Sequence, residues 1–212
     1  MKSTSIDRIS EERRLGITED ARMNTFHHYY CRSGTWRRTV RERLMPWVLS
    51  DVDLGADVLE VGPGPGLTTD VLADRFAHLT CVEKDPKLAA SLARRRGGEQ
   101  VEVVEADATN LPFLDRRFSG AVSCTMLHHV PSPALQDRLL AEVARVLAPG
   151  AWLVGSDSVA STLFRLAHWG DTMVLVDPDT LGGRLERAGF RDVRVERAAR
   201  AFRFQARRAA IA

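Results

Sequence analysis

The amino-acid sequence predicts an α/β fold, in which a mostly parallel sheet carries helices on both faces and ends with an antiparallel strand. The main observation is that short runs rich in Val and Leu alternate with segments of helical period from residue 57 to about residue 208. Gly and Pro residues mark where several of these segments begin or end. The chain has 212 residues, of which 44% are hydrophobic, enough for one substantial core but not for two full-sized domains.

The first half of the expected sheet contains three strands and two helices. The strands are the short apolar runs over residues 57–62, 79–83 and 101–104. A first helix is expected because apolar residues recur on one face of the segment, at Leu67, Val71, Leu72 and Phe76. The next helix begins at Pro86, since a proline ring suits a first helical turn, and it ends at the glycine pair 97–98.

The second half begins with a strand over 118–124 and a helix over 133–147. Ser132 is the expected cap of this helix, and the pair Pro149-Gly150 stops it. The serine hydroxyl can accept a hydrogen bond from an unpaired N–H of the first turn, and proline cannot continue a helix.

The last elements are a fifth strand over 151–155, a helix from Asp177-Pro178 to Gly189, and a closing hairpin over 193–195 and 201–206. Sheets built in this way bind their ligands outside the carboxyl ends of the strands. The turns that follow the strands are therefore where we expect the functional residues.

Two parts precede this pattern. Residues 1–22 are polar with little to bury, so a disordered tail is expected there. Residues 23–54 are expected to form a helical lid beside the sheet, because Val40, Leu44 and Trp47 are in helical phase. Its polar and aromatic residues either line an acceptor pocket or pack against the sheet: His27, His28, Tyr29, Tyr30 and Trp36. The domain itself then covers residues 55–212.

The formal net charge is only +2, but the charge is unevenly spread, with nine Arg and three acids in residues 184–208. Basic side chains spread singly along terminal elements are typical of a solvated surface, so a nucleic-acid partner is not expected. No apolar run approaches the roughly 18 residues of a membrane-spanning helix. The charged first 30 residues do not resemble a secretory signal, so the expected location is the cytoplasm.

Neither disulfides nor a metal site are expected. Cys31, Cys81 and Cys124 are widely spaced without a Cys-x-x-Cys pattern, which predicts reduced and mostly buried thiols. His168 and Asp171 could join the pair His128 and His129, but they form no compact ligand pattern.

The turn after the first strand reads Gly62-Pro63-Gly64-Pro65-Gly66, and three ligand classes compete for it. A phosphate-binding Walker loop would end in Gly-Lys-Ser/Thr, yet Leu67 follows Gly66. A dinucleotide fingerprint would place its third glycine where Leu67 stands. Moreover, Pro63 and Pro65 remove two backbone donors that a pyrophosphate would use. A nicotinamide cofactor is therefore disfavoured but stays open as an alternative. The third class is a nucleoside linked to an amino acid, which carries no pyrophosphate.

Two acids farther along the chain favour this third class. Glu83 ends the second strand, seventeen positions after Gly66, where a carboxylate can accept hydrogen bonds from both ribose hydroxyls. Asp107 follows the third strand and can accept from an adenine amino group, while the Ala108 amide can donate to a ring nitrogen.

With these motifs in place, the sequence resembles the class I S-adenosylmethionine-dependent methyltransferases of the type 11 kind over about residues 55–208. The first family motif corresponds to residues 58–66, the ribose acid to Glu83 and the adenine acid to Asp107. The resemblance implies a seven-stranded Rossmann-like sheet with an antiparallel last hairpin, S-adenosylmethionine as cofactor and S-adenosylhomocysteine as product. The candidate cofactor-binding residues are Glu60, Gly62, Gly64, Gly66, Glu83, Lys84, Asp107, Ala108 and Thr125. Among them, Glu60 is expected near the cofactor's ammonium group, and Lys84 over the adenine.

His128 and His129 are the candidate catalytic residues. They follow the fourth strand, where a neutral imidazole could take a proton from an acceptor hydroxyl or amine. Helix-turn packing is the alternative role for both.

The expected activity is methyl transfer by in-line displacement to a small-molecule or lipid-like acceptor, through oxygen, nitrogen or carbon. Adenine-amino methylases resemble one another in an Asn/Asp-Pro-Pro-Tyr/Phe motif, which is absent from Cys124-Thr125-Met126-Leu127. A cofactor-binding module without catalysis and an RNA methyltransferase remain the alternatives. The oligomeric state is left open, with a homodimer as one option.

Overall fold

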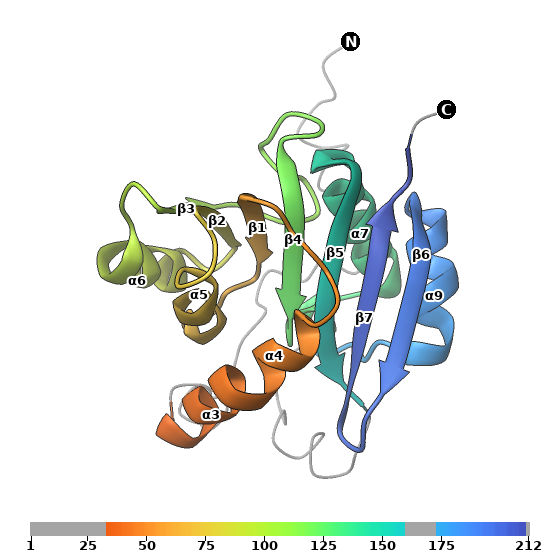
Figure 1. The fold of residues 1–212 in the computed structure, drawn as a ribbon, viewed down its shortest axis with the longest axis horizontal. Coiled ribbons are helices and arrows are strands. Elements are labelled where there is room, and N and C mark those ends of the chain that lie inside the picture. The colour runs from red at the N-terminus through yellow and green to blue at the C-terminus, as the bar shows by residue number, and fades with distance from the viewer. Residues whose placement is uncertain (1–32, 160–172, 211–212) are drawn as a thin grey trace, which may run out of the picture.

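The computed structural model describes residues 33–159 and 173–210, which build one seven-stranded sheet (Figure 1). The strands are β1 (Asp57–Val61), β2 (His78–Glu83), β3 (Val101–Glu105), β4 (Phe118–Cys124), β5 (Leu147–Ser158), β6 (Phe190–Arg197) and β7 (Ala201–Arg208). Their order is β3-β2-β1-β4-β5-β7-β6. Neighbours among β1 to β5 pair in parallel, whereas β7 is antiparallel to both β5 and β6. The predicted Rossmann-like sheet with an antiparallel closing hairpin is confirmed.

The strand order reverses next to β1. The chain moves outward from β1 to β2 and β3, and it returns on the other side of β1 as β4. In open parallel sheets, ligands bind outside the carboxyl ends of the strands at such a switch point. The glycine turn after β1 and Thr125 after β4 lie at this edge.

Helices cover both faces of the sheet, as predicted. They are α3 (Gly34–Thr39), the π-helix η1 (Val40–Leu44), α4 (Met45–Val48), α5 (Leu67–Leu72), α6 (Pro86–Arg96), the 3-10 helix η2 (Leu127–His129), α7 (Pro133–Val146) and α9 (Pro178–Arg187). One buried cluster joins α4, α5 and α6 to one face, and a second joins α7 and α9 to the other. In Figure 1, α4 lies in front of the sheet while α7 and α9 lie behind it.

Three of the predicted helices begin at a capping side chain. The side chains of Asp85, Ser132 and Asp177 each accept a hydrogen bond from a backbone N–H of the first turn. A proline follows each cap directly, where the missing N–H would have had no partner in the helix. Local chemistry therefore sets the starts of α6, α7 and α9.

Several boundaries differ from the prediction, among them those of β6, which runs from Phe190 to Arg197 rather than over 193–195. β5 begins at Leu147 rather than at residue 151, because Leu147 already pairs with Phe118 through a register shift in the β4–β5 ladder. α5 ends at Leu72, short of Phe76, although Phe76 still packs against the core as a partly buried side chain. The chain must turn back there to begin β2 at His78.

The expected N-terminal helix contains a wider turn. α3, η1 and α4 follow one another without a break, and Pro46 lies in α4. Proline has no N–H and its ring clashes with the carbonyl four residues earlier, so a regular α-helix cannot pass through it undisturbed. The N–H of Met45 bonds instead to the carbonyl of Val40, five residues earlier. The expected tail 1–22, and the lid before residue 33, lie outside the described residues.

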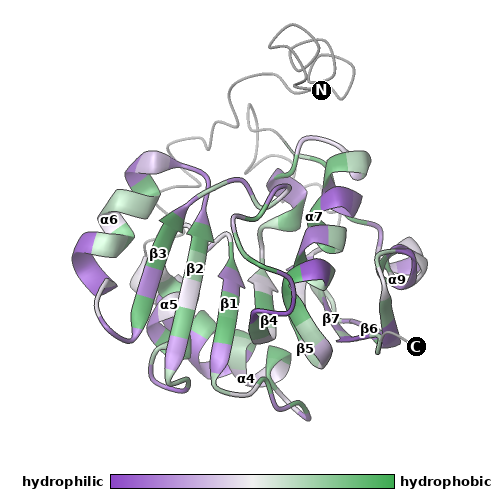
Figure 2. Ribbon diagram, turned by 90° about the horizontal axis from the view of Figure 1, so that it is seen from above, coloured by the Kyte–Doolittle hydropathy of each residue, from purple (hydrophilic) through white to green (hydrophobic). Residues whose placement is uncertain are grey.

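The connection from β3 to β4 is a loop without a helix, and α7 holds it in place. The N–H of Leu111 donates to Oε2 of Glu142 at 2.8 Å. Arg145 donates to the carbonyls of Leu111 at 2.9 Å and Phe113 at 2.8 Å. On the face of the sheet that α7 covers, Figure 2 shows no described helix over β2 and β3. The loop begins just after β3, so these bonds also limit the positions open to Asp107.

Within residues 33–159 and 173–210, no helix is long and apolar enough to span a membrane. Cys81 and Cys124 are buried free thiols, as expected. The pKa of both thiols is raised well above the ordinary cysteine range. Burial is the larger cause, and the negative charge of Glu60 is the second. Cys31 lies outside the described residues.

Candidate functional site

The turn between β1 and α5 has left-handed backbone geometry at all three glycines. The angle φ is 67° at Gly62, 54° at Gly64 and 80° at Gly66, values that residues with side chains rarely adopt. A Cβ added to Gly62 would lie 2.8 Å from Cε of Met126. One added to Gly64 would meet no described atom within 4 Å. The turn therefore packs tightly at its start and faces open space at its middle.

Glu83 ends β2 and reaches across to this turn. Its Oε2 accepts a hydrogen bond from the N–H of Gly64 at 2.9 Å, and its Oε1 accepts one from the N–H of Asp85 at 2.9 Å. Burial raises the pKa of the Glu83 carboxyl above its ordinary value, and these two backbone donors offset only part of that effect. Each carboxylate oxygen keeps a further lone pair, so Glu83 can still accept from two hydroxyls.

Asp107 follows β3 and pairs with Lys84 from the end of β2. Lys84 Nζ lies 2.7 Å from Oδ2 of Asp107, and the N–H and hydroxyl of Thr109 both donate to Oδ1 at 2.8 Å. Burial acts to raise the pKa of Asp107, but the hydrogen bonds from Lys84 and Thr109 outweigh it and lower the pKa. Asp107 is therefore an ionised acceptor at neutral pH, and Lys84 lies beside it across the strand ends.

Glu60 lies below the turn and is 2% exposed. Its carboxylate accepts hydrogen bonds from the hydroxyls of Thr68 and Thr69 at the start of α5, and from the thiol of Cys81 at 3.3 Å. Burial raises the pKa of Glu60, while these three donors lower it in part. The side chain braces the start of α5, and its expected role toward a cofactor ammonium group stays a prediction.

Thr125 and Met126 continue from β4 toward the glycine turn. Thr125 has φ 52°, an unusual left-handed conformation for a β-branched residue, and its N–H donates to the carbonyl of Ser156 at 2.7 Å. Backbone strain of this kind is concentrated at functional sites. The contact of Met126 with the Gly62 position places the start of η2 directly beside the turn.

His128 pairs with an acid that sequence reasoning missed. Nδ1 of His128 lies 2.5 Å from Oδ1 of Asp157, and the backbone N–H of His128 donates to Oδ2 at 3.1 Å. The two residues are 2% and 1% exposed. Parallel pairing of β4 and β5 brings Asp157 next to η2. Its position near the carboxyl end of the fifth strand was the signal that could have identified it.

His129 lies beside His128, with ring centroids 4.1 Å apart, and is only half-buried. Ala108 is buried against the core that α7 covers. Both residues therefore lie at the edge of the sheet where the sequence predicts them. Their roles toward a cofactor or an acceptor stay predictions.

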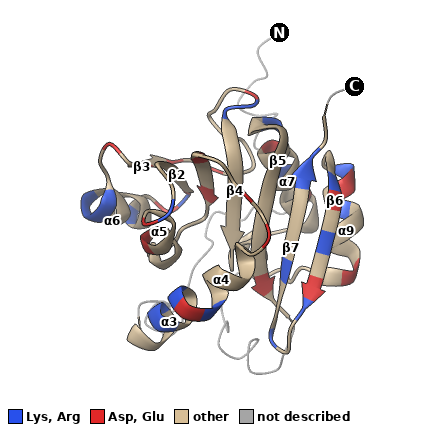
Figure 3. Cartoon of the chain, in the orientation of Figure 1, with Lys and Arg blue, Asp and Glu red and all other residues tan. Residues whose placement is uncertain are grey.

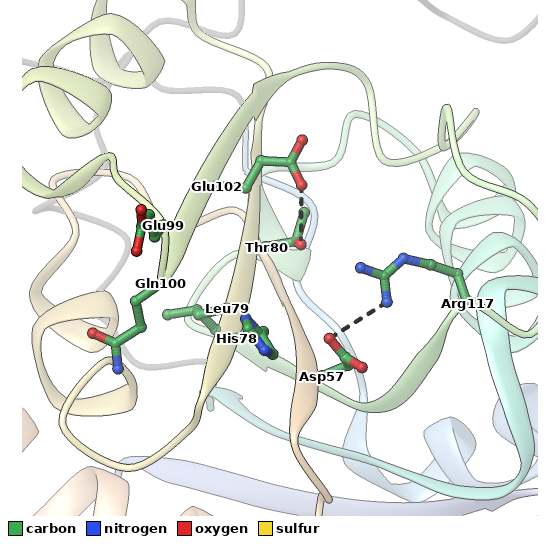
Figure 4. A pocket seen from close by; sticks show the side chains of 8 residues that line it. All are labelled: Asp57, His78, Leu79, Thr80, Glu99, Gln100, Glu102 and Arg117. Carbon is green, nitrogen blue, oxygen red and sulfur yellow. Dashed lines mark hydrogen bonds and ion pairs between the residues drawn. The ribbon is translucent and has the colours of Figure 1, made fainter.

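A cavity of about 330 Å³ lies at the opposite end of the strands (Figure 4). It is lined by Asp57, His78, Leu79, Thr80, Glu99, Gln100, Glu102 and Arg117. Asp57 and His78 are the first residues of β1 and β2, whereas the glycine turn and Glu83 follow the last residues of these strands. The cavity is therefore separate from the candidate site.

Some expected residues cannot be placed at the site. His27, His28, Tyr29 and Tyr30 lie outside the described residues, as do His168 and Asp171. Trp36, the described member of the aromatic cluster, packs against the core that includes α4 and α5. Within the described ranges, no group of three or more His, Cys, Asp or Glu residues could hold a metal ion.

The residues present fit an adenosyl group with an amino-acid tail. Glu83 and Asp107 offer carboxylate acceptors at the ends of adjacent strands β2 and β3. The open space at Gly64 lets a ligand approach the backbone of the turn. Pro63 and Pro65 provide no N–H groups, so the turn lacks the row of donors that a diphosphate requires.

Comparison with known proteins places this geometry in context. Residues 59–155 match the family model described as a methyltransferase domain. A ribosomal RNA small subunit methyltransferase A of Bordetella pertussis is 41% identical over 78 residues, 37% of this chain and 29% of that protein. The O-methyltransferase cnsE of Penicillium expansum is 34% identical over 154 residues, 66% of this chain and 54% of that protein. The chain thus spans about half or less of the length of these relatives.

The fold is also found in solved structures. A SAM-dependent methyltransferase from Aquifex aeolicus superposes with a TM-score of 0.68 at 19% identity, covering 88% of this chain and 99% of that chain. The family match runs from β1 to β5 and so includes the glycine turn, both strand-end acids and η2. Residues 59–155, slightly less than half of the chain, thus match a methyltransferase domain, in line with the resemblance to the class I S-adenosylmethionine-dependent methyltransferases of the type 11 kind.

Proposed function

We propose that this chain transfers a methyl group from S-adenosylmethionine to a hydroxyl group of a small-molecule acceptor, with His128 as the base. The observation that carries the proposal is the buried pair of His128 and Asp157, with 2.5 Å between Nδ1 and Oδ1. An acceptor that must lose a proton needs such a base, whereas a nucleophile without a proton to lose does not.

The cofactor is expected to bind across the carboxyl ends of β1, β2 and β3. Glu83 would accept the two ribose hydroxyls and Asp107 the adenine amino group, with Lys84 and the Ala108 amide beside the base. Gly62, Gly64 and Gly66 would let the amino-acid tail approach the backbone, and Thr125 would border it from β4. When bound, S-adenosylmethionine supplies an electrophilic methyl group on a positively charged sulfur.

His128 and Asp157 divide the work of proton transfer. With Nδ1–H of His128 donating to the Asp157 carboxylate, a neutral imidazole would carry its lone pair on Nε2. Nε2 would take the proton of the acceptor hydroxyl as the new carbon–oxygen bond forms and the carbon–sulfur bond breaks. Asp157 stabilises the resulting imidazolium and fixes the ring orientation. Holding acceptor and methyl group at attack distance can contribute roughly 7 to 11 kcal/mol.

A small acceptor is favoured by two observations. Residues 124–127 lack the motif shared by adenine-amino methylases. Of the two curated relatives described above, the one that matches the larger share of this chain is an O-methyltransferase. The described part of the expected lid, α3 to α4, lies near the carboxyl end of β4 (Figure 1), where it could form one wall of an acceptor pocket. The cytoplasmic location likewise stays a prediction from the sequence.

The test measures S-adenosylhomocysteine formation with a panel of phenols and alcohols. His128→Gln should lower turnover by roughly 10²- to 10⁴-fold while leaving S-adenosylhomocysteine affinity within about twofold, because a base acts only on the acceptor. Asp157→Asn should lower turnover less, and His129→Gln is the neighbouring control. Unchanged turnover of His128→Gln from pH 6 to pH 9 would show that His128 is not the base. Cofactor binding without turnover of any acceptor would favour a non-catalytic module.

RNA is a second candidate acceptor, so the sequence-based expectation against nucleic acid is not retained. One face of the β5–β7–β6 region carries basic and aromatic side chains, together with Glu196, which pairs with the largely buried Arg203: Arg191, Arg194, Arg203, Arg207, Trp47 and Trp152. Figure 3 shows the blue bands of Lys and Arg along β6 and β7. One compared relative is a ribosomal RNA methyltransferase. Copurifying RNA, with affinity that falls steeply as salt is raised, would favour this candidate.

A further inference from the structure

We propose that Arg95 is a positioning residue that holds the glycine turn in its cofactor-binding shape. The inference rests on the proposed placement of the cofactor over this turn. The run Arg94-Arg95-Arg96 lies at the carboxyl end of α6, where cations interact well with the helix dipole. The structure gives Arg95 directed contacts that this general effect does not explain.

The guanidinium of Arg95 contacts the turn from α6. Its Nη2 donates to the carbonyl of Pro65 at 2.9 Å and to the carbonyl of Gly66 at 3.2 Å. A Cβ added to Gly66 would lie 2.5 Å from this same Nη2. The glycine at position 66 thus allows both the left-handed bend and the close approach of Arg95.

Asp70 orients Arg95 from the first turn of α5. Nη1 of Arg95 donates to Oδ1 of Asp70, and Nε of Arg96 donates to the same oxygen at 2.7 Å. The Asp70 side chain is 11% exposed, so this carboxylate is largely shielded from water. Arg95 therefore joins three segments in a closed set of contacts: the turn, the start of α5 and the end of α6.

The turn's own backbone supplies only part of its support, through the hydrogen bond from the N–H of Gly66 to the carbonyl of Pro63 at 2.9 Å. Its prolines lack N–H groups, and its three glycines permit many conformations when nothing restrains them. The N–H of Gly64 is held from β2 by Glu83, the carbonyl of Pro65 by Arg95, and the carbonyl of Gly66 by both Arg95 and the N–H of Asp70. Without Arg95, cofactor binding would have to order this part of the turn, and affinity would fall accordingly.

The experiment compares Arg95→Met, Arg95→Lys and Arg94→Met in the full chain. Arg94 is the matched control, because it is exposed in the same last turn of α6 and contributes equally to the helix dipole. Calorimetry gives the affinity for S-adenosylhomocysteine, thermal unfolding gives the stability of the free protein, and hydrogen exchange reports on the amides of Gly64 and Gly66.

Arg95→Met should weaken S-adenosylhomocysteine binding by about tenfold, equivalent to about 1.4 kcal/mol. Exchange should become faster at Gly64 and Gly66, with little change in the thermal midpoint. Arg95→Lys should lie between Arg95→Met and the natural protein, since one ammonium group cannot reach Asp70 and both carbonyls at once. Arg94→Met should bind like the natural protein. If Arg95→Met fails to fold, Arg95→Lys decides by the same readouts.

Two results would overturn the inference. One is affinity within twofold of the natural protein. The other is faster exchange spread evenly over β1, α5 and α6, which indicates general destabilisation. Glu83→Ala, measured in parallel, distinguishes an error in the proposed cofactor site from an error in the role given to Arg95. If it also leaves affinity unchanged, the cofactor does not bind at this turn; if only Arg95→Met does, the turn binds the cofactor without help from Arg95.

Discussion

The N–H of Gly64 donates to Oε2 of Glu83 at 2.9 Å and so joins the turn after β1 to the end of β2. This bond holds the two parts of the proposed ribose site together. It also uses only one lone pair of that oxygen, which leaves the carboxylate able to accept hydroxyl groups.

Glu83→Ala should weaken S-adenosylhomocysteine binding by at least roughly 10- to 100-fold, because the loss of even one hydrogen bond to a charged group costs about 1.5 to 3 kcal/mol. Isothermal calorimetry gives the affinity directly. Glu105→Gln is the matched control, since Glu105 pairs in register with Glu83 on the adjacent strand but is exposed. An equal loss in both variants would point to overall charge rather than a ribose contact.

The affinity for S-adenosylhomocysteine should fall as pH decreases through the raised pKa of Glu83. Burial places that pKa above the ordinary 4.5, and the two hydroxyls require the ionised carboxylate. Asp107 stays ionised over this range because its pKa is lowered. Calorimetry between pH 4.5 and pH 8 measures the slope, which Glu83→Gln should abolish.

The stability of the free protein should respond to the same titration with the opposite sign. A carboxyl group with a raised pKa binds more protons in the folded state, so its contribution to stability is lost as pH rises from 4.5 through the raised value. Unfolding of the natural protein and of Glu83→Gln should therefore differ increasingly as pH rises through this window. Parallel stability curves would mean that burial of Glu83 does not penalise its ionised form.

Gly64→Ala should weaken cofactor binding by more than about tenfold while lowering the free energy of unfolding by only roughly 1 to 2 kcal/mol, the cost of a left-handed alanine. The added methyl group meets no described atom, so it projects into the space assigned to the cofactor. Gly150→Ala carries the same strain at φ 82°, with its nearest neighbour 3.6 Å away and outside the site. Equal affinities of the two variants would place the cofactor elsewhere.

Gly155→Ala should destabilise the fold by about 2 kcal/mol or more, because overpacking a core forces neighbours to move. Its Cβ would lie 2.2 Å from the carbonyl oxygen of Ser123 and 2.3 Å from the ring of Phe204. Gly98→Ala, which meets nothing within 4 Å, should change stability by less than about 0.5 kcal/mol. Denaturant unfolding of both variants tests the difference.

Much of the fold could be predicted because its signals are local. The cap of α7 at Ser132 and the strand over 118–124 depend on a few neighbouring residues, and both appear where predicted. The early start of β5 depends on pairing of Leu147 with Phe118, 29 positions away in the chain. No local pattern contains that information, so the predicted boundary was wrong.

The candidate site, like the fold, was predictable only where its signals are local in the sequence. The chain order of residues, with glycines after one strand and single acids after the next two, was sufficient to indicate the ligand class and the sheet edge, because parallel strands bring their carboxyl ends together. The pairing of His128 with Asp157 and the contact of Arg95 with Pro65 depended on packing, since each joins residues about 30 positions apart. Side-chain partners over such distances are set by strand register and helix placement, which only the folded chain provides.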